Sequence, residues 1–252
     1  MKLVYFLAEA CKNTFVFFDW IEDELSSWKG AHSALLKERR DDAIILTLEN
    51  KSSTALYLKM HVLGADGKFG EFCGNGARCA AAYLFSRYPE YKEFYIVTRR
   101  GTYPLLSLGK GIYAVHLPKV QFSKGKANSI AYGEILEPHL ALEMSLSDTD
   151  LYKLGSYMNE QKECFPDGIN VNAWHVLNPS TIAVKTYERG VQRLTQSCGT
   201  GSSVCASLFI KGEGRVFVKT PGGPLLIRIQ KEHLELIGAA QFSPHQIEME
   251  YP

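Results

Sequence analysis

Two cysteines stand at the start of glycine-rich segments that repeat one another. The segments read Cys73-Gly74-Asn75-Gly76-Ala77 and Cys198-Gly199-Thr200-Gly201-Ser202, and each is expected to open a helix of small residues. A helix start carries unpaired N–H groups and a partial positive charge, which bind carboxylate oxygens and favour a thiolate over a thiol. The duplication therefore predicts a cleft with one reactive cysteine on each wall.

The expected chemistry is acid–base catalysis by a thiolate and a thiol. A helix terminus contributes about 0.3 to 2 kcal/mol, which lowers a cysteine pKa by less than about 1.5. Such a cysteine is substantially but not wholly ionised at neutral pH, so one residue can act as the base and the other as the acid. Inversion at a carbon centre needs this pair, and the helix N–H groups would hold the carboxylate that takes up the developing charge.

The repeat extends beyond the cysteines. Each predicted helix is followed by a β-branched strand and then by a strand with a Gly and a Pro-Leu-Leu triplet, at 95–106 in the first half and at 216–226 in the second. The offset between the copies is 125 residues at Cys73 and Cys198 and 120 residues at Pro104 and Pro224. A repeat of this length indicates a duplicated domain half.

Composition limits the class of protein. The chain has 252 residues, 46% hydrophobic and 22% charged, which suits two domains of about 100 to 150 residues. Its formal net charge is +1, without a long basic or acidic run, so we expect no nucleic-acid partner and no membrane partner but a small molecule. The six cysteines lack the spacing of a disulfide scaffold or a C-x-x-C site, and this favours a cytoplasmic protein.

Hydrophobic patterning predicts an α/β (α+β) fold of mostly antiparallel sheet. We expect a first lobe over 1–120 and a second over 121–252, joined at the polar segment 121–128; a return of the last strand, about 241–252, to the first lobe is left open. Strands are expected near 2–7, 15–19, 43–49, 55–63, 129–136, 139–144, 169–177 and 180–187, with a hairpin over 103–117. Helices are expected near 32–40, 75–88, 148–161 and 200–211, the third capped by Ser147 or Asp148.

Three longer segments together resemble one family. They are Glu71-Phe72-Cys73-Gly74-Asn75-Gly76-Ala77-Arg78-Cys79, Tyr187-Glu188-Arg189-Gly190 and Ser197-Cys198-Gly199-Thr200-Gly201, and they closely resemble diaminopimelate epimerases, which are cofactor-independent amino acid epimerases. The resemblance implies two pseudo-symmetric lobes, each a barrel-like sheet around a central helix, with the substrate in the cleft. It also implies interconversion of LL- and meso-2,6-diaminopimelate in the synthesis of lysine and peptidoglycan.

The resemblance also assigns roles to residues. Cys73 and Cys198 would be the acid–base pair, and His139 and Glu188 would assist catalysis. No cofactor and no metal ligand is implied, and a homodimer is the assembly considered. The substrate-binding residues would be Asn13, Gly74, Asn75, Asn170, Glu188, Arg189, Gly199 and Thr200, of which Gly74, Asn75, Gly199 and Thr200 lend backbone N–H groups to the reacting carboxylate.

Two departures from the family pattern concern substrate choice. Gly64 and Glu137 stand where the family has asparagines that recognise the distal, non-reacting end of the substrate. Losing hydrogen-bond donors there weakens discrimination more than chemistry, so we expect intact racemisation with relaxed distal specificity, admitting a shorter acidic amino acid.

Other classes of function are left open by the sequence. One is a racemase of another amino acid such as glutamate. Others are a redox protein that pairs Cys73 with Cys198, or an anion-binding module, although the Gly-Lys-Ser/Thr of a P-loop is missing. The remaining cysteines carry no catalytic signal: Cys79 and Cys205 are expected to be buried, and Cys11 and Cys164 to be filler.

Overall fold

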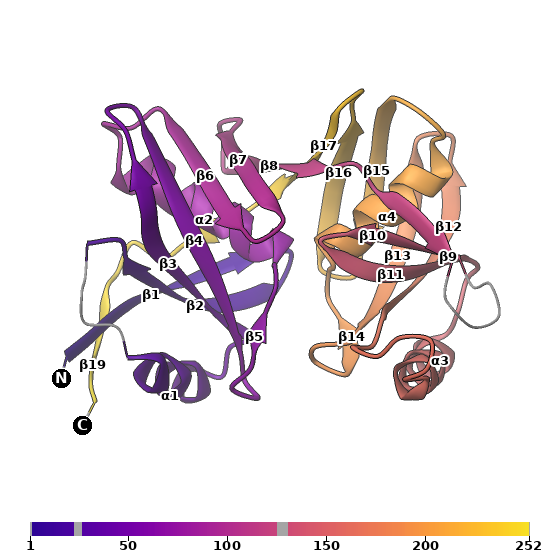
Figure 1. The fold of residues 1–252 in the computed structure, drawn as a ribbon, viewed down its shortest axis with the longest axis horizontal. Coiled ribbons are helices and arrows are strands. Elements are labelled where there is room, and N and C mark those ends of the chain that lie inside the picture. The colour runs from indigo at the N-terminus through magenta and orange to yellow at the C-terminus, as the bar shows by residue number, and fades with distance from the viewer. Residues whose placement is uncertain (1, 23–26, 125–130, 252) are drawn as a thin grey trace. The chain divides into compact units, whose positions relative to one another are not determined.

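The chain folds into two compact units. A computed structural model describes residues 2–22, 27–124 and 131–251 (Figure 1). Met1–Val115 and Gly238–Pro252 form the first unit, and His116–Ile237 forms the second. Each unit is a curled, mostly antiparallel sheet with helices, which confirms the predicted α/β class of barrel-like halves.

The elements of the first unit come from both ends of the chain. They are β1 (Lys2–Ala10), β2 (Asn13–Trp20), α1 (Trp28–Glu38), β3 (Asp42–Lys51), β4 (Ala55–Gly64), β5 (Phe69–Gly70), α2 (Gly74–Arg87), β6 (Glu93–Thr98), β7 (Gly101–Ser107), β18 (Gln241–Phe242) and β19 (Ile247–Glu250). Two further strands, β8 (Ile112–Pro118) and β17 (His233–Ala239), carry the chain from the first unit to the second and back.

The second unit is continuous in sequence. Its elements are β9 (Gln121–Lys124), β10 (Ala131–Ile135), β11 (Glu137–Glu143), α3 (Asp148–Glu160), β12 (Asn170–Asn178), β13 (Thr181–Glu188), β14 (Arg193–Thr195), α4 (Gly199–Phe209), β15 (Gly214–Thr220) and β16 (Gly223–Ile229).

The two units repeat one order of elements. Parallel neighbours need a crossover connection, and each helix supplies one. In the first unit α1 connects the parallel pair β2–β3 and α2 connects β4–β6; in the second, α3 connects β11–β12 and α4 connects β13–β15. The other pairings whose register the structure describes are antiparallel, among them β1–β2, β3–β4 and β15–β16. The duplicated cysteine motifs therefore begin equivalent helices, α2 and α4.

The central helices α2 and α4 can be buried because their side chains are small. α2 contacts β1, β3, β6, β7 and β18, and its alanines Ala80–Ala82 are inaccessible or nearly so. α4 contacts β10–β13, β15 and β16 in the same way. Cys79 and Cys205 are buried inside these helices, as predicted. Among the residues that the structure describes, no helix is long and apolar enough to span a membrane.

The outer helices α1 and α3 pack against β2 and β3 and against β12–β14, respectively, and both begin at serine caps. Ser147 Oγ accepts from the Asp150 N–H at 3.1 Å, in agreement with the predicted start of α3. α1 begins at Trp28, before the predicted residue 32, because Ser27 Oγ accepts from the Gly30 N–H at 3.1 Å and provides an earlier cap.

The border between the units lies inside a strand. It falls between Val115 and His116 in β8, before the predicted border at residue 120, because β8 continues unbroken and pairs with β17. The predicted linker 121–128 begins with a strand, since Gln121–Lys124 forms β9 and pairs with β10; its remaining residues lie outside the described ranges. The returning C-terminal segment starts at Gly238 rather than near 241, and β18 and β19 both pair with β1.

Gly155 offers a test of how α3 packs on its sheet. A Cβ at this position would lie 2.2 Å from Cγ of the buried Tyr187. We expect Gly155→Ala to lower the free energy of unfolding by about 1–3 kcal/mol, although alanine favours helix, because the ring has to move. Urea unfolding measures this, with Lys153→Ala at an exposed position of α3 as the control. Equal stability of Gly155→Ala and the wild type would contradict the packing.

Candidate active site

Cys73 is the N-cap of α2. Its backbone is extended, with φ −131° and ψ 109°, and its half-buried Sγ accepts from the Gly76 N–H at 3.3 Å. A Cβ at residue 76 would lie 2.5 Å from Ile44 Cδ1, so glycine allows this turn to lie directly on β3. The sulfur thus lies beside unpaired N–H groups at the positive end of a helix dipole.

A chain of hydrogen bonds lies beneath this helix start. Asn75 Nδ2 donates to Asn13 Oδ1 at 2.5 Å, and Arg78 Nη2 donates to Asn75 Oδ1 at 2.7 Å. The same guanidinium lies 3.4 Å from both the Gly74 carbonyl oxygen and Cys11 Sγ. Asn13, Gly74, Asn75 and Cys73, all predicted from sequence, are therefore brought together in the first unit.

Arg78 is one of two residues of these sites to which the sequence analysis gave no role. It is fully inaccessible to solvent, and burial lowers the pKa of its guanidinium, while the nearby thiols of Cys11, Cys79 and Cys73 oppose that shift. Arg78 follows Asn75 by three residues, and residues i and i+3 share a helix face, so this spacing could have predicted the contact between them. Cys11, predicted to be filler, is one of its partners.

Cys198 is the N-cap of α4, at the equivalent place in the second unit. Its Sγ lies 3.4 Å from Thr200 Oγ1, and the residue is buried. Burial raises the pKa of this thiol well above its ordinary value, and the negative charge of Glu188 raises it further; the Thr200 hydroxyl and the Gly201 N–H act in the opposite direction. Cys198 is therefore a thiol at neutral pH.

The residue that corresponds to Arg78 is Ser203, five positions after its cysteine. Ser203 Oγ donates to the Gly199 carbonyl oxygen at 2.9 Å, where Arg78 approaches the Gly74 carbonyl oxygen. The two helix starts thus share a backbone design but differ in charge. A buried cation lies below one cysteine, and a neutral hydroxyl lies below the other.

His139 lies beneath the first turn of α4. It is completely buried on β11, and its Nδ1 is 3.3 Å from Asn172 Nδ2. A Cβ on Gly201 would lie 2.1 Å from Asn172 Oδ1 and 3.2 Å from His139 Nδ1, which shows how closely the turn packs. Burial, with the positive charge of Arg189, lowers the pKa of His139 to about 3, so the ring is neutral at working pH.

Asn172 was also missed by sequence reasoning. Its Nδ2 donates to the Leu140 carbonyl oxygen at 3.1 Å, and its Oδ1 accepts from Thr186 Oγ1 at 2.8 Å. Asn172 follows the predicted site residue Asn170 by two positions. Because alternate residues of a strand share a face, this spacing could have placed Asn172 on the same side of the sheet.

Asn170 connects the remaining predicted residues of the second unit. Its Oδ1 accepts from the Arg189 N–H at 3.0 Å, and its Nδ2 donates to Glu137 Oε2 at 3.0 Å. Glu188 Oε1 accepts from Thr195 Oγ1, and the charges of Glu188 and Glu137 both act on Cys198. The second unit therefore gathers Cys198, Gly199, Thr200, His139, Asn170, Glu188 and Arg189 around one helix start.

Comparison with known proteins identifies the family. The family model described as diaminopimelate epimerase matches residues 145–243. A curated diaminopimelate epimerase from Chlorobaculum tepidum is 34% identical over 178 residues, which cover 68% of this chain and 68% of that protein. This chain belongs to the diaminopimelate epimerase family. A second relative with the same name, from Thermotoga maritima, is 32% identical over 71% of this chain and 75% of its own length.

Solved structures share the family's fold. A predicted epimerase from Pseudomonas aeruginosa superposes with a TM-score of 0.70 at 13% identity, covering 99% of this chain and 100% of that one. A hydroxyproline epimerase from Agrobacterium vitis gives a TM-score of 0.69 at 10% identity, covering 98% and 91%. The fold and the family together make this chain an isomerase of the amino acid epimerase and racemase type.

The burial of His139 predicts a pH-dependent stability. The folded ring has a pKa of about 3 against 6.5 for an ordinary histidine. Between pH 6.5 and about pH 3, the histidine is protonated in the unfolded chain but not in the folded one. The free energy of unfolding is therefore highest above pH 6.5 and decreases as the pH falls through this range. Between about pH 7 and pH 5 the wild type should lose about 2 kcal/mol more than His139→Gln.

Urea unfolding at both pH values measures the difference, with His245→Gln at an exposed position as the control. Equal losses in the wild type and His139→Gln would show that His139 does not carry this effect.

Proposed function

We propose that this protein interconverts LL- and meso-2,6-diaminopimelate by moving the α-proton between two cysteines. The observation that carries the proposal is the duplicated N-cap cysteine, found at the start of α2 and again at the start of α4. Membership of the diaminopimelate epimerase family supports the choice of substrate.

Cys73 is the base of the proposed resting enzyme and Cys198 is the acid. The Cys73 thiolate removes the α-hydrogen as a proton, and the electron pair of the C–H bond passes into the substrate carboxylate. Cys198 then delivers its proton to the opposite face of the same carbon, which leaves Cys73 as a thiol and Cys198 as a thiolate. The reverse direction exchanges the two roles.

Electrostatics supports this division of roles. The helix start and the buried Arg78 favour negative charge at Cys73, whereas burial and the charge of Glu188 keep Cys198 protonated. When Cys198 gives up its proton, the Gly201 N–H and the Thr200 hydroxyl are placed to receive the new charge. The neutral His139 supports this turn from below and is a positioning residue in the proposal.

The helix starts would also hold the reacting carboxylate. The backbone N–H groups of Gly74, Asn75, Gly199 and Thr200 are the proposed donors, and each preorganised donor contributes about 3 kcal/mol in a site without water. Asn13, Asn170, Glu188 and Arg189 are the proposed contacts to the rest of the substrate. With charge delocalised in this way, the proposed reaction needs no pyridoxal phosphate, and we assign it to lysine and peptidoglycan precursor synthesis in the cytoplasm.

We further propose that recognition of the distal end is relaxed. Gly64 ends β4 at a tight turn and offers no side chain, and Glu137 offers a carboxylate that already accepts a hydrogen bond from Asn170. Neither residue donates hydrogen bonds as an asparagine would. A shorter acidic amino acid would therefore compete more effectively than in a relative with both asparagines.

Exchange of the α-proton with deuterated solvent tests the two-base assignment. Wild-type protein should exchange and epimerise diaminopimelate, while Cys73→Ala and Cys198→Ala should each lose at least about 10³-fold in kcat/KM, because one proton transfer has no partner. Cys164→Ala is the matched control and should retain activity. Full epimerisation by either active-site variant would overturn the proposal.

Restoring an asparagine tests the specificity proposal. Glu137→Asn should raise the ratio of kcat/KM for diaminopimelate over that for glutamate by about tenfold, and Gly64→Asn with Glu137→Asn should raise it further. Glu143→Gln, at an exposed position of the same strand, should leave the ratio unchanged. Strict use of diaminopimelate by the wild type against a panel of amino acids would refute relaxed specificity and leave the two-base mechanism intact.

A further inference from the structure

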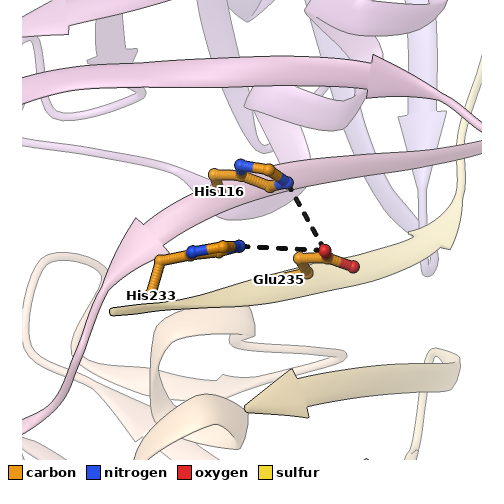
Figure 2. Close-up of side chains that lie close together, drawn as sticks. All are labelled: His116, His233 and Glu235. Carbon is orange, nitrogen blue, oxygen red and sulfur yellow. Dashed lines mark ion pairs between the residues drawn. The ribbon is translucent and has the colours of Figure 1, made fainter. Parts of the chain in front are cut away.

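Two histidines and a glutamate meet outside the cysteine sites. His116 lies on β8, and His233 and Glu235 lie two residues apart on β17, so both project from one face of that strand. Since β8 and β17 pair, the three side chains converge although His116 and His233 are 117 positions apart in the sequence. Figure 2 shows both imidazole rings directed toward the carboxylate.

The distances in this cluster suit a metal ion better than hydrogen bonds. Nε2 of His116 and Nε2 of His233 lie 3.5 and 3.8 Å from Glu235 Oε1. A hydrogen bond between such atoms would be about 2.7–3.2 Å long. Two ligands held about 2.0–2.1 Å from a tetrahedral zinc ion lie about 3.3–3.4 Å apart, close to the observed separations. All three candidate ligand atoms lie within 4.8 Å of one another.

The ligand atoms are available for coordination. Within the described part of the chain, Nε2 of both histidines is buried without a hydrogen-bond partner. The rings stack with centroids 4.4 Å apart and planes 29° from parallel, which keeps the two nitrogens on the same side.

Arg228 orients the carboxylate. Its Nη1 lies 2.7 Å from Glu235 Oε2, the oxygen that does not face the histidines. This contact leaves Oε1 as a single ligand atom directed toward the imidazoles. Only 9% of the Glu235 side chain is exposed, while 25% of His116 and 36% of His233 are exposed, so the histidine side of the cluster lies nearer the solvent.

We propose that His116, His233 and Glu235 bind one divalent transition-metal ion, with Zn²⁺ the best-matched ion. Two imidazoles and one carboxylate are a recognised ligand set for zinc, and a water molecule would complete the tetrahedron. The ion would join β8 to β17, the two strands through which the chain passes between its units. Because three ligands form an open site, we expect readily reversible binding rather than that of a closed structural site.

Titration of the full chain, stripped of metal with a chelator, tests the proposal. Co²⁺ is the probe because its d–d absorption reports tetrahedral binding, and a cysteine ligand would add a thiolate charge-transfer band. We expect one equivalent to bind without that band, and Zn²⁺ to displace it. His116→Gln, His233→Gln and Glu235→Gln should each weaken binding by about tenfold or more, and His175→Gln and Glu232→Gln should leave it unchanged.

Thermal unfolding provides a second readout that is independent of activity. Zn²⁺ should raise the melting temperature of the wild type and of both controls, because an ion that binds only the folded chain stabilises it, and the rise should vanish in the three ligand variants. Circular dichroism without metal establishes that each variant is folded. Absence of binding by the wild type, a thiolate band, or equal binding by the ligand variants and the controls would each overturn the proposal.

Discussion

The proposed chemistry depends on how closely a helix start can approach its surroundings. A helix offers unpaired N–H groups only in its first turn, and a thiol benefits from them only when it is the residue that caps that turn. Both units meet this condition by placing glycines where a side chain would collide with Ile44, Leu236 or Asn172. The curled sheets then serve chiefly to enclose α2 and α4 and to hold their starts in place.

The duplicated motif places two cysteines at equivalent positions, but the surrounding residues of each unit give the two thiols different electrostatic environments. Arg78 lies below the first turn of α2, and Ser203 takes its place in α4. Glu188 and Glu137 add negative charge near Cys198, and burial there opposes ionisation. A two-base reaction needs opposite protonation states on similar groups, and this asymmetry within a repeated backbone is a physical route to that difference.

The sequence predicted features that local patterns encode. The helix starts at both cysteines, the cap at Ser147 and the duplicated order of elements all follow from glycine, serine and hydrophobic spacing within a few residues. Partnerships across the sheet were not predictable in this way. Asn13 reaches Asn75, and Cys11 reaches Arg78, only because β1 and β2 pair beside α2. Strand pairing also places the border inside β8 and gathers His116 with Glu235. Register between distant strands has no local signature.

The return of the C-terminal segment makes the first unit discontinuous. β19 pairs with β1 so that Lys2 lies opposite Glu250, and their neighbourhood is reinforced by an ion pair between Lys2 and Glu248. During synthesis on the ribosome, the second unit has all of its strands available while β18 and β19 are still being made. Until β18 and β19 are made, one side of β1 has no strand paired with it. The order of translation therefore favours completion of the second unit before the first.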